Sequence, residues 1–77
     1  MTEISIKELS DIVEKRLFSA GKMLLSDALA KLGLSATDSL TPEDAIFALE
    51  VMRESMHSDV SKDAVNKCIE DITSKYA

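Results

Sequence analysis

The chain has 77 residues, of which 45% are hydrophobic and 30% charged, and its formal net charge is −5. This length suits one domain, over residues 1–77, and the composition is too apolar for a disordered chain. The acidic balance argues against direct contact with nucleic acid, because phosphates are bound by basic patches.

The acidic charge is concentrated in one part of the chain. Residues 38–59 hold six acids and one base, Arg53, so this segment alone carries a charge of −5. The other eight acids and eight bases cancel. A surface shaped only for solubility would spread its charge more evenly. The six acids are Asp38, Glu43, Asp44, Glu50, Glu54 and Asp59.

Two helices are predicted in the first half of the chain, over residues 6–20 and 22–32. Ser5 with Glu8 three residues later forms a capping box at the start of the first helix. Gly21 and Gly33 each follow an apolar stripe and are expected to end these helices in the left-handed conformation. Gly21 could instead lie inside one long helix, at a cost of about 1 kcal/mol relative to alanine, but the stripe restarts with a different phase after it, which favours a break. The two stripes consist of Ile6, Leu9, Val13, Leu17 and Ala20, and of Leu25, Ala28, Leu29 and Leu32.

A third helix is predicted over residues 42–56, with Thr41 as its N-cap and Pro42 in its first position. A fourth is expected over residues 62–75, capped by Ser61, with Val60 packing against Val65 as a hydrophobic staple. No segment alternates between apolar and polar residues, so no strand is expected. The sequence therefore predicts an all-α fold, a compact bundle of four short amphipathic helices, with its topology left open. The core stripes of these two helices are Ala45, Ile46, Leu49, Met52 and Met56, and Val65, Cys68, Ile69, Ile72 and Tyr76.

The residues give no sign of catalysis. The single histidine, His57, falls in a predicted turn, and the single cysteine, Cys68, falls on a core stripe, where a thiol is unreactive. One histidine and one cysteine are too few for a structural zinc site, and no glycine-rich phosphate loop is present. We therefore expect no enzyme activity, no bound metal and no cofactor.

A cytoplasmic location is expected. A single cysteine cannot form an internal disulfide, which favours a reducing compartment. The longest purely apolar run, residues 23–25, is far too short to span a membrane. Residues 1–5 lack the basic and apolar regions of a secretory signal.

The outer face of the third helix carries an unusual mixture of residues. With a rotation of 100° per residue along the helix, the acidic and apolar residues of this face cluster opposite the core stripe. An aromatic and a β-branched side chain ringed by carboxylates would suit a docking surface, with an apolar anchor and acids that attract a basic partner. Phe47 could instead pack under a neighbouring helix or under the 34–40 loop. Phe18, which lies off the main stripe of the first helix, could cover Phe47 or belong to the same surface. The members of this face are Glu43, Phe47, Glu50, Val51 and Glu54.

The leading hypothesis is thus a non-enzymatic protein–protein interaction module, such as an adaptor, inhibitor or accessory subunit, that binds a protein with a basic surface. Homodimer formation is left open. A weaker alternative is that the acidic face mimics nucleic acid and binds a protein that normally binds nucleic acid.

A second alternative comes from the tripeptide Asp38-Ser39-Leu40. In this motif, in length, in acidity and in the helix that follows, the chain resembles the acyl carrier proteins. That resemblance implies phosphopantetheine attached to Ser39, with the acidic helix docking basic patches on partner enzymes. The likeness is confined to the region around residues 38–50, and Glu43 stands where carrier proteins have an apolar residue.

Overall fold

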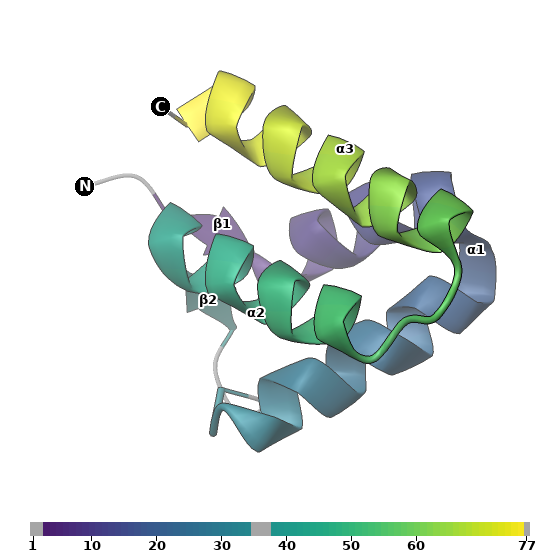
Figure 1. Ribbon diagram of the computed structural model, residues 1–77. Helices are drawn as coiled ribbons and strands as arrows, with labels where there is room; N and C mark the ends of the chain where they lie inside the picture. The colour runs from purple at the N-terminus through teal and green to yellow at the C-terminus, as the bar shows by residue number, and fades with distance from the viewer. Residues whose placement is uncertain (1–2, 35–37, 77) are drawn as a thin grey trace.

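The computed structural model describes residues 3–34 and 38–76, which contain three helices and a pair of very short strands. Figure 1 shows α1 (Ile6–Lys31), α2 (Pro42–Glu54) and α3 (Asp59–Tyr76) packed against one another. The predicted all-α class is confirmed. The predicted number of helices is wrong, because the segments expected as the first and second helices are joined in α1.

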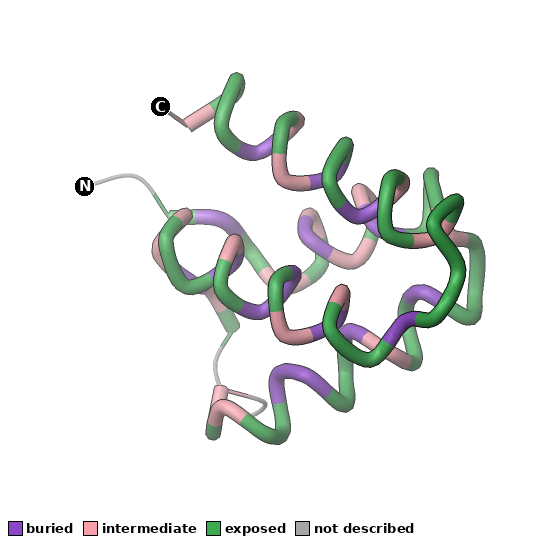
Figure 2. The backbone as a smooth tube through the Cα atoms, in the orientation of Figure 1, coloured by how far each residue is buried: buried purple, intermediate pink, exposed green. Residues whose placement is uncertain are grey.

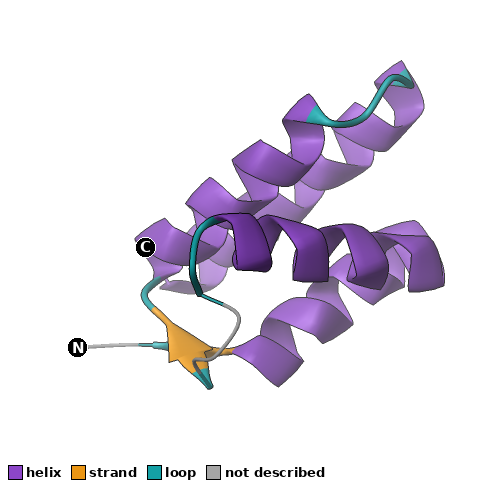
Figure 3. Ribbon diagram, turned by 90° about the horizontal axis from the view of Figure 1, so that it is seen from below, coloured by secondary structure: helices purple, strands orange, loops and turns teal. Residues whose placement is uncertain are grey.

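The two strands are β1 (Ile4–Ser5) and β2 (Ser39–Leu40), which pair antiparallel with Ile4 opposite Leu40 and Ser5 opposite Ser39. The backbone N–H of Ile6 extends the pairing by donating to the carbonyl of Asp38 at 2.9 Å. Figure 3 shows the pair at one end of the molecule. The expectation of no strand was wrong because two-residue strands are too short to show an alternating pattern.

A sharp kink divides α1 at Phe18, three residues before the predicted break. Phe18 has φ 62° and ψ −158°, a backbone region that is essentially restricted to glycine and costs about 1–3 kcal/mol for other residues. Gly21 does not end a helix; it is buried within the second half of α1. A Cβ atom there would lie 2.5 Å from Cβ of Leu17 and 2.9 Å from Cγ1 of Val13. Gly21 is therefore needed for the close approach of the two halves.

Three of the other predicted helix ends fit the structure more closely. The Ser5 hydroxyl accepts the Glu8 N–H at 3.0 Å, and the Thr41 hydroxyl accepts the Asp44 N–H at 3.1 Å, as expected for N-caps. The predicted capping box at Ser5 forms only in part, because the Glu8 carboxylate accepts from Lys75 and Tyr76. Gly33 follows α1 with φ +72°, the predicted left-handed conformation.

The start of the last helix differs from the prediction. α3 begins at Asp59, and Ser58 rather than Ser61 lies at its N-terminal end, with its hydroxyl accepting the Ser61 N–H at 3.4 Å. Val60 is 80% exposed, so the predicted staple with Val65 does not form. Two serines three residues apart offer the same capping signal, which explains the error.

The core is aliphatic, and it lies where the three helices face one another (Figure 2). Both strands add to it through Ile4 and Leu40, so the strand pair closes one end of the core. The predicted stripes supply most of the core, whereas Ala20 is exposed. The buried residues are Ile4, Leu9, Val13, Leu25, Ala28, Leu29, Leu40, Ala45, Ala48, Leu49, Met52, Met56, Val65, Cys68 and Ile72.

Candidate functional site

The outer face of α2 presents an exposed aromatic ring among carboxylates. Phe47 is 52% exposed, and Glu43, Glu50 and Glu54 on the same face are all exposed. The opposite side of the helix is buried in the core through residues such as Leu49. The phase of the helix therefore directs Phe47 away from the core, which resolves the alternative that a neighbouring helix covers it.

Val51 lies at the edge of this face rather than at its centre. It is half-buried and lines a shallow groove of about 130 Å³ between α2 and the second half of α1. Leu24 and Ala28 line the apolar part of the groove, and Asp27 and Lys31 line its polar part. Because Phe47 and Val51 are one helical turn apart, their side chains are neighbours on the helix surface.

Arg53, the only base in α2, contacts both α3 and one of the three glutamates. The Arg53 guanidinium donates from Nη1 to Oδ1 of Asn66 on α3 at 2.6 Å, and its Nη2 lies 3.8 Å from Oε2 of Glu50. No ion pair involves Glu43 or Glu54 within the part of the chain that the structure describes. The face thus keeps most of its negative charge open to a partner.

The position of Glu54 is unfavourable for the helix itself. A carboxylate in the first turn, such as Glu43, is stabilised by the positive end of the helix dipole. Glu54 is the last residue of α2, at the negative end, where a carboxylate opposes the dipole by about 0.3–1 kcal/mol. Helix stability therefore explains why a glutamate stands at position 43, but it does not explain the glutamate at position 54.

Ser39, the residue singled out by the resemblance to acyl carrier proteins, lies in β2 opposite Ser5. Its side chain is half-buried, and its hydroxyl donates to Oε1 of Glu3 at 2.9 Å. α2 begins at Pro42, so Ser39 precedes the first turn of the helix. The hydroxyl is held against the strand pair rather than at the helix N-terminus.

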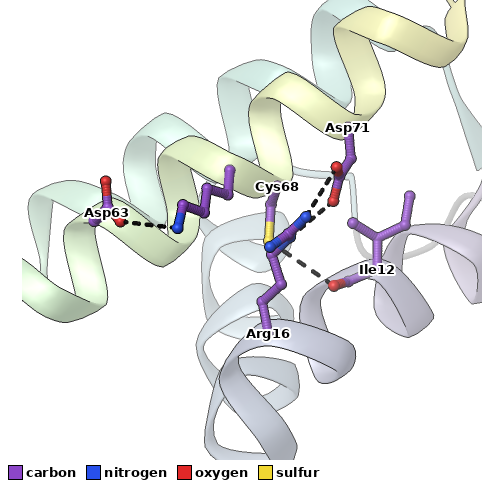
Figure 4. A network of polar contacts seen from close by, with 6 residues as sticks. Ile12, Arg16, Asp63, Cys68 and Asp71 are labelled. Carbon is purple, nitrogen blue, oxygen red and sulfur yellow. Dashed lines mark hydrogen bonds and ion pairs between the residues drawn. The ribbon is translucent and has the colours of Figure 1, made fainter.

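Cys68 is fully buried, as its place on the core stripe predicted. Burial raises the pKa of its thiol to about 11, and its Sγ lies 3.9 Å from the carbonyl oxygen of Ile12 (Figure 4). A neutral, covered thiol is a poor nucleophile. His57 is exposed in the turn between α2 and α3.

Across residues 3–34 and 38–76, no group of three or more His, Cys, Asp or Glu side chains is placed to hold a metal ion. Over the same residues, no helix combines the length and apolar character that crossing a bilayer requires.

Three more large apolar side chains are exposed in the described residues, and of these only Phe18 was singled out from the sequence. Phe18 at the kink is 74% exposed, and Met23 and Val60 are also exposed. A groove of about 360 Å³ lies between the kink and the turn that joins α2 to α3. Its apolar lining includes Leu17, Leu24 and Met56. None of the three glutamates on the outer face of α2 lines this groove.

Comparison with models of protein families, with curated proteins and with solved structures finds no match to this chain.

Proposed function

We propose that the chain is a non-enzymatic interaction module that binds a protein with a basic surface through the outer face of α2. One observation carries this proposal: Phe47 stands half exposed among three exposed glutamates, Glu43, Glu50 and Glu54. This face, together with Val51 at its edge, is named the docking surface below.

The two kinds of residue have different roles in the proposed complex. Covering an exposed phenylalanine ring removes apolar area from water, and full burial of such a side chain contributes roughly 1.5–3 kcal/mol. Aromatic anchors near the centre of an interface commonly dominate its binding energy. The glutamates around Phe47 increase the rate of association with a basic partner and disfavour acidic ones. Phe47 therefore supplies affinity, and the acids supply partner selection.

The proposed setting is the cytoplasm, where the thiol of Cys68 stays reduced.

The test compares two double variants in affinity capture from the native host. Phe47→Ala with Glu50→Lys removes the anchor and reverses one charge on the docking surface. The matched control, Val60→Ala with Glu70→Lys, makes the same kinds of change at exposed positions on α3. Circular dichroism and thermal unfolding establish that both variants keep the fold.

We expect the protein captured by the wild type to be captured by the control and lost by the docking-surface variant. Quantitative binding to that protein is expected to weaken as salt rises, because salt screens charge attraction between exposed groups. Equal capture by both variants, or equal loss, contradicts the proposal. A captured protein that releases this chain when DNA is added would favour the nucleic-acid-mimic alternative.

The carrier-protein alternative has its own direct test. The chain is incubated with coenzyme A and a phosphopantetheinyl transferase, and its mass is measured beside that of Ser39→Ala. A mass gain that requires Ser39 would replace the proposed function with acyl carriage. An unchanged mass leaves the docking surface as the functional feature.

A further inference from the structure

The strained kink at Phe18 separates two parts of the chain that touch through well-defined contacts. We call residues 3–17 the N-terminal arm and residues 19–34 and 38–76 the body. Figure 1 shows the two halves of α1 running in different directions on either side of the bend. The kink holds a phenylalanine in a conformation suited to glycine, yet the Phe18 ring is 74% exposed and so gains little from burial.

The arm binds the body through contacts that do not require the two to belong to one chain. β1 pairs with β2, and the Ile6 N–H donates to Asp38. Arg16 of the arm forms two hydrogen bonds with the Asp71 carboxylate of α3, as Figure 4 shows. Near the C-terminal end of α3, Lys75 and Tyr76 donate to Glu8 of the arm. The same contacts can form between the arm of one molecule and the body of another.

Straightening the kink would force the arm to leave its own body. A continuous α1 of 26 residues is about 39 Å long. The molecule measures 34 × 25 × 18 Å along its principal axes, so a straight α1 exceeds its longest dimension. Hinges that are short and strained favour exchange of an element between copies.

We propose that α1 is a two-state hinge: kinked at Phe18 it gives the monomer, and straight it gives a dimer in which two copies exchange their N-terminal arms. The partner is thus a second copy of this chain. Exchange restores the arm–body contacts that lie away from the hinge in each half of the dimer, and it relieves the strain at both Phe18 residues. The close contact of Gly21 with Val13 and Leu17 lies beside the hinge and opens when α1 is straight. Because α2 remains in the body, each dimer carries two docking surfaces, which would strengthen binding to a repeated partner if the proposed function holds.

Substitutions at Gly21 and at Phe18 are expected to shift the equilibrium between the kinked monomer and the straight dimer in opposite directions. Gly21→Ala places a Cβ where only glycine fits in the kinked form. In a straight helix residues 17 and 21 are ordinary neighbours one turn apart, about 5–6 Å apart at Cβ, so alanine is accommodated there. Phe18→Gly relieves the strain of the kinked form and disfavours the straight helix. Phe18→Ala removes the exposed ring but keeps a residue that is strained at the kink.

The wild type and each variant are refolded at a series of concentrations. Size-exclusion chromatography with light scattering then gives the dissociation constant of each dimer. We expect Gly21→Ala to lower that constant more than about tenfold and Phe18→Gly to raise it more than about tenfold. Phe18→Ala should dimerise at least as well as the wild type. If Phe18→Ala and Phe18→Gly weaken dimerisation equally, the ring itself is the contact and the proposal is overturned. Failure of both the wild type and Gly21→Ala to dimerise also overturns it.

A mixing experiment keeps the wild-type hinge and guards against a Gly21→Ala protein that does not fold. Arg16→Asp places two acids in the arm–body contact of one chain, and Asp71→Arg places two bases in that of the other. In an exchanged heterodimer each arm again meets a body of opposite charge. Native mass spectrometry of the co-refolded pair should show heterodimer in excess of random pairing. Random pairing, or no dimer at all, means that the arms are not exchanged and overturns the proposal.

Discussion

Arg16 and Asp71, 55 residues apart in the chain, form a two-pronged contact that joins the first half of α1 to α3. Nε and Nη2 of Arg16 donate to the two carboxylate oxygens of Asp71 at 2.8 and 3.1 Å. Both side chains remain partly exposed. Paired geometry of this kind is the strongest form of the arginine–carboxylate interaction, although water and salt weaken it at the surface.

The first prediction concerns acid stability. The Arg16 guanidinium, chiefly through its hydrogen bonds, holds the pKa of Asp71 below its ordinary value of 3.8. The contact therefore stabilises the fold above the unfolded-state pKa and loses its effect as pH falls through the lower folded-state pKa. Asp71→Asn is expected to cost about 0.5–1 kcal/mol in unfolding free energy at pH 7, and less in strong acid. Urea unfolding of the wild type and of Asp71→Asn at several pH values measures the cost at pH 7 and its decrease in acid.

A matched control lies on the same helix. Asp63 pairs with Lys67 at 3.5 Å within one turn of α3, so Asp63→Asn removes an aspartate without loosening α1 from α3. Its expected cost is about 0.3–0.5 kcal/mol. If Asp71→Asn and Asp63→Asn showed the same pH dependence, the contact between α1 and α3 would not be the source of the acid effect.

The second prediction concerns the reactivity of Cys68. Burial raises the pKa of its thiol from an ordinary value of 9.0 to about 11. At pH 8 the folded protein then holds about a hundredfold less thiolate than the unfolded chain, before any steric protection is added. Alkylation by iodoacetamide should therefore be slowed at least a hundredfold in the native protein, with the urea-unfolded chain as control. Equal rates would show that the thiol is accessible.

The third prediction follows from the same pKa at alkaline pH. The unfolded chain ionises this thiol near pH 9, before the folded protein does, so its contribution to stability is present below that pH and lost as pH rises toward 11. Cys68→Ala lacks this titration and is expected to cost about 1 kcal/mol at pH 7. A rise in pKa from 9.0 to about 11 corresponds to about 2.7 kcal/mol, so the gap in unfolding free energy between the two proteins should narrow above pH 9 and reverse before pH 11. A constant gap would contradict the assigned shift.

The fourth prediction isolates backbone strain at Gly33. This residue has φ +72°, and nothing lies within 4 Å of the place where a Cβ atom would stand. Gly33→Ala should therefore cost about 1 kcal/mol in unfolding free energy through backbone conformation alone. Gly33→Asn should cost less, because asparagine adopts the left-handed conformation more readily. Thermal unfolding compares the stabilities of Gly33→Ala and Gly33→Asn. Equal losses of stability in the two variants would mean that backbone conformation is not the cause.

The sequence predicted features that depend on local chemistry and missed those that depend on packing. The caps at Ser5 and Thr41 and the left-handed turn at Gly33 each rest on a residue type with one strong local preference. The kink at Phe18 has no such signal, because phenylalanine is an ordinary helix residue. Gly21 did give a signal, but glycine marks a helix end and a close approach alike. Only the packing of Gly21 against Val13 and Leu17 separates those meanings.

The candidate docking surface shows the same division. Helical phase correctly directs Phe47 and the glutamates away from the core, because that phase is fixed by the buried residues of α2. The same phase does not reveal that Val51 borders a groove with α1, since that depends on how the two helices pack.

The last prediction uses Tyr76 as a reporter of the junction between α1 and α3. Its hydroxyl donates to Glu8, and this hydrogen bond to a carboxylate raises the pKa of Tyr76 above its ordinary value. The chain has one tyrosine and no tryptophan, so the absorbance of tyrosinate reports this site alone. Glu8→Gln keeps the shape of the side chain and removes its charge, and it should bring the pKa of Tyr76 back toward the ordinary value. Glu14→Gln, farther along α1 and paired with Lys22, should leave the titration unchanged. A wild-type curve identical to that of Glu8→Gln would mean that Tyr76 does not hold the end of α3 against α1 in solution.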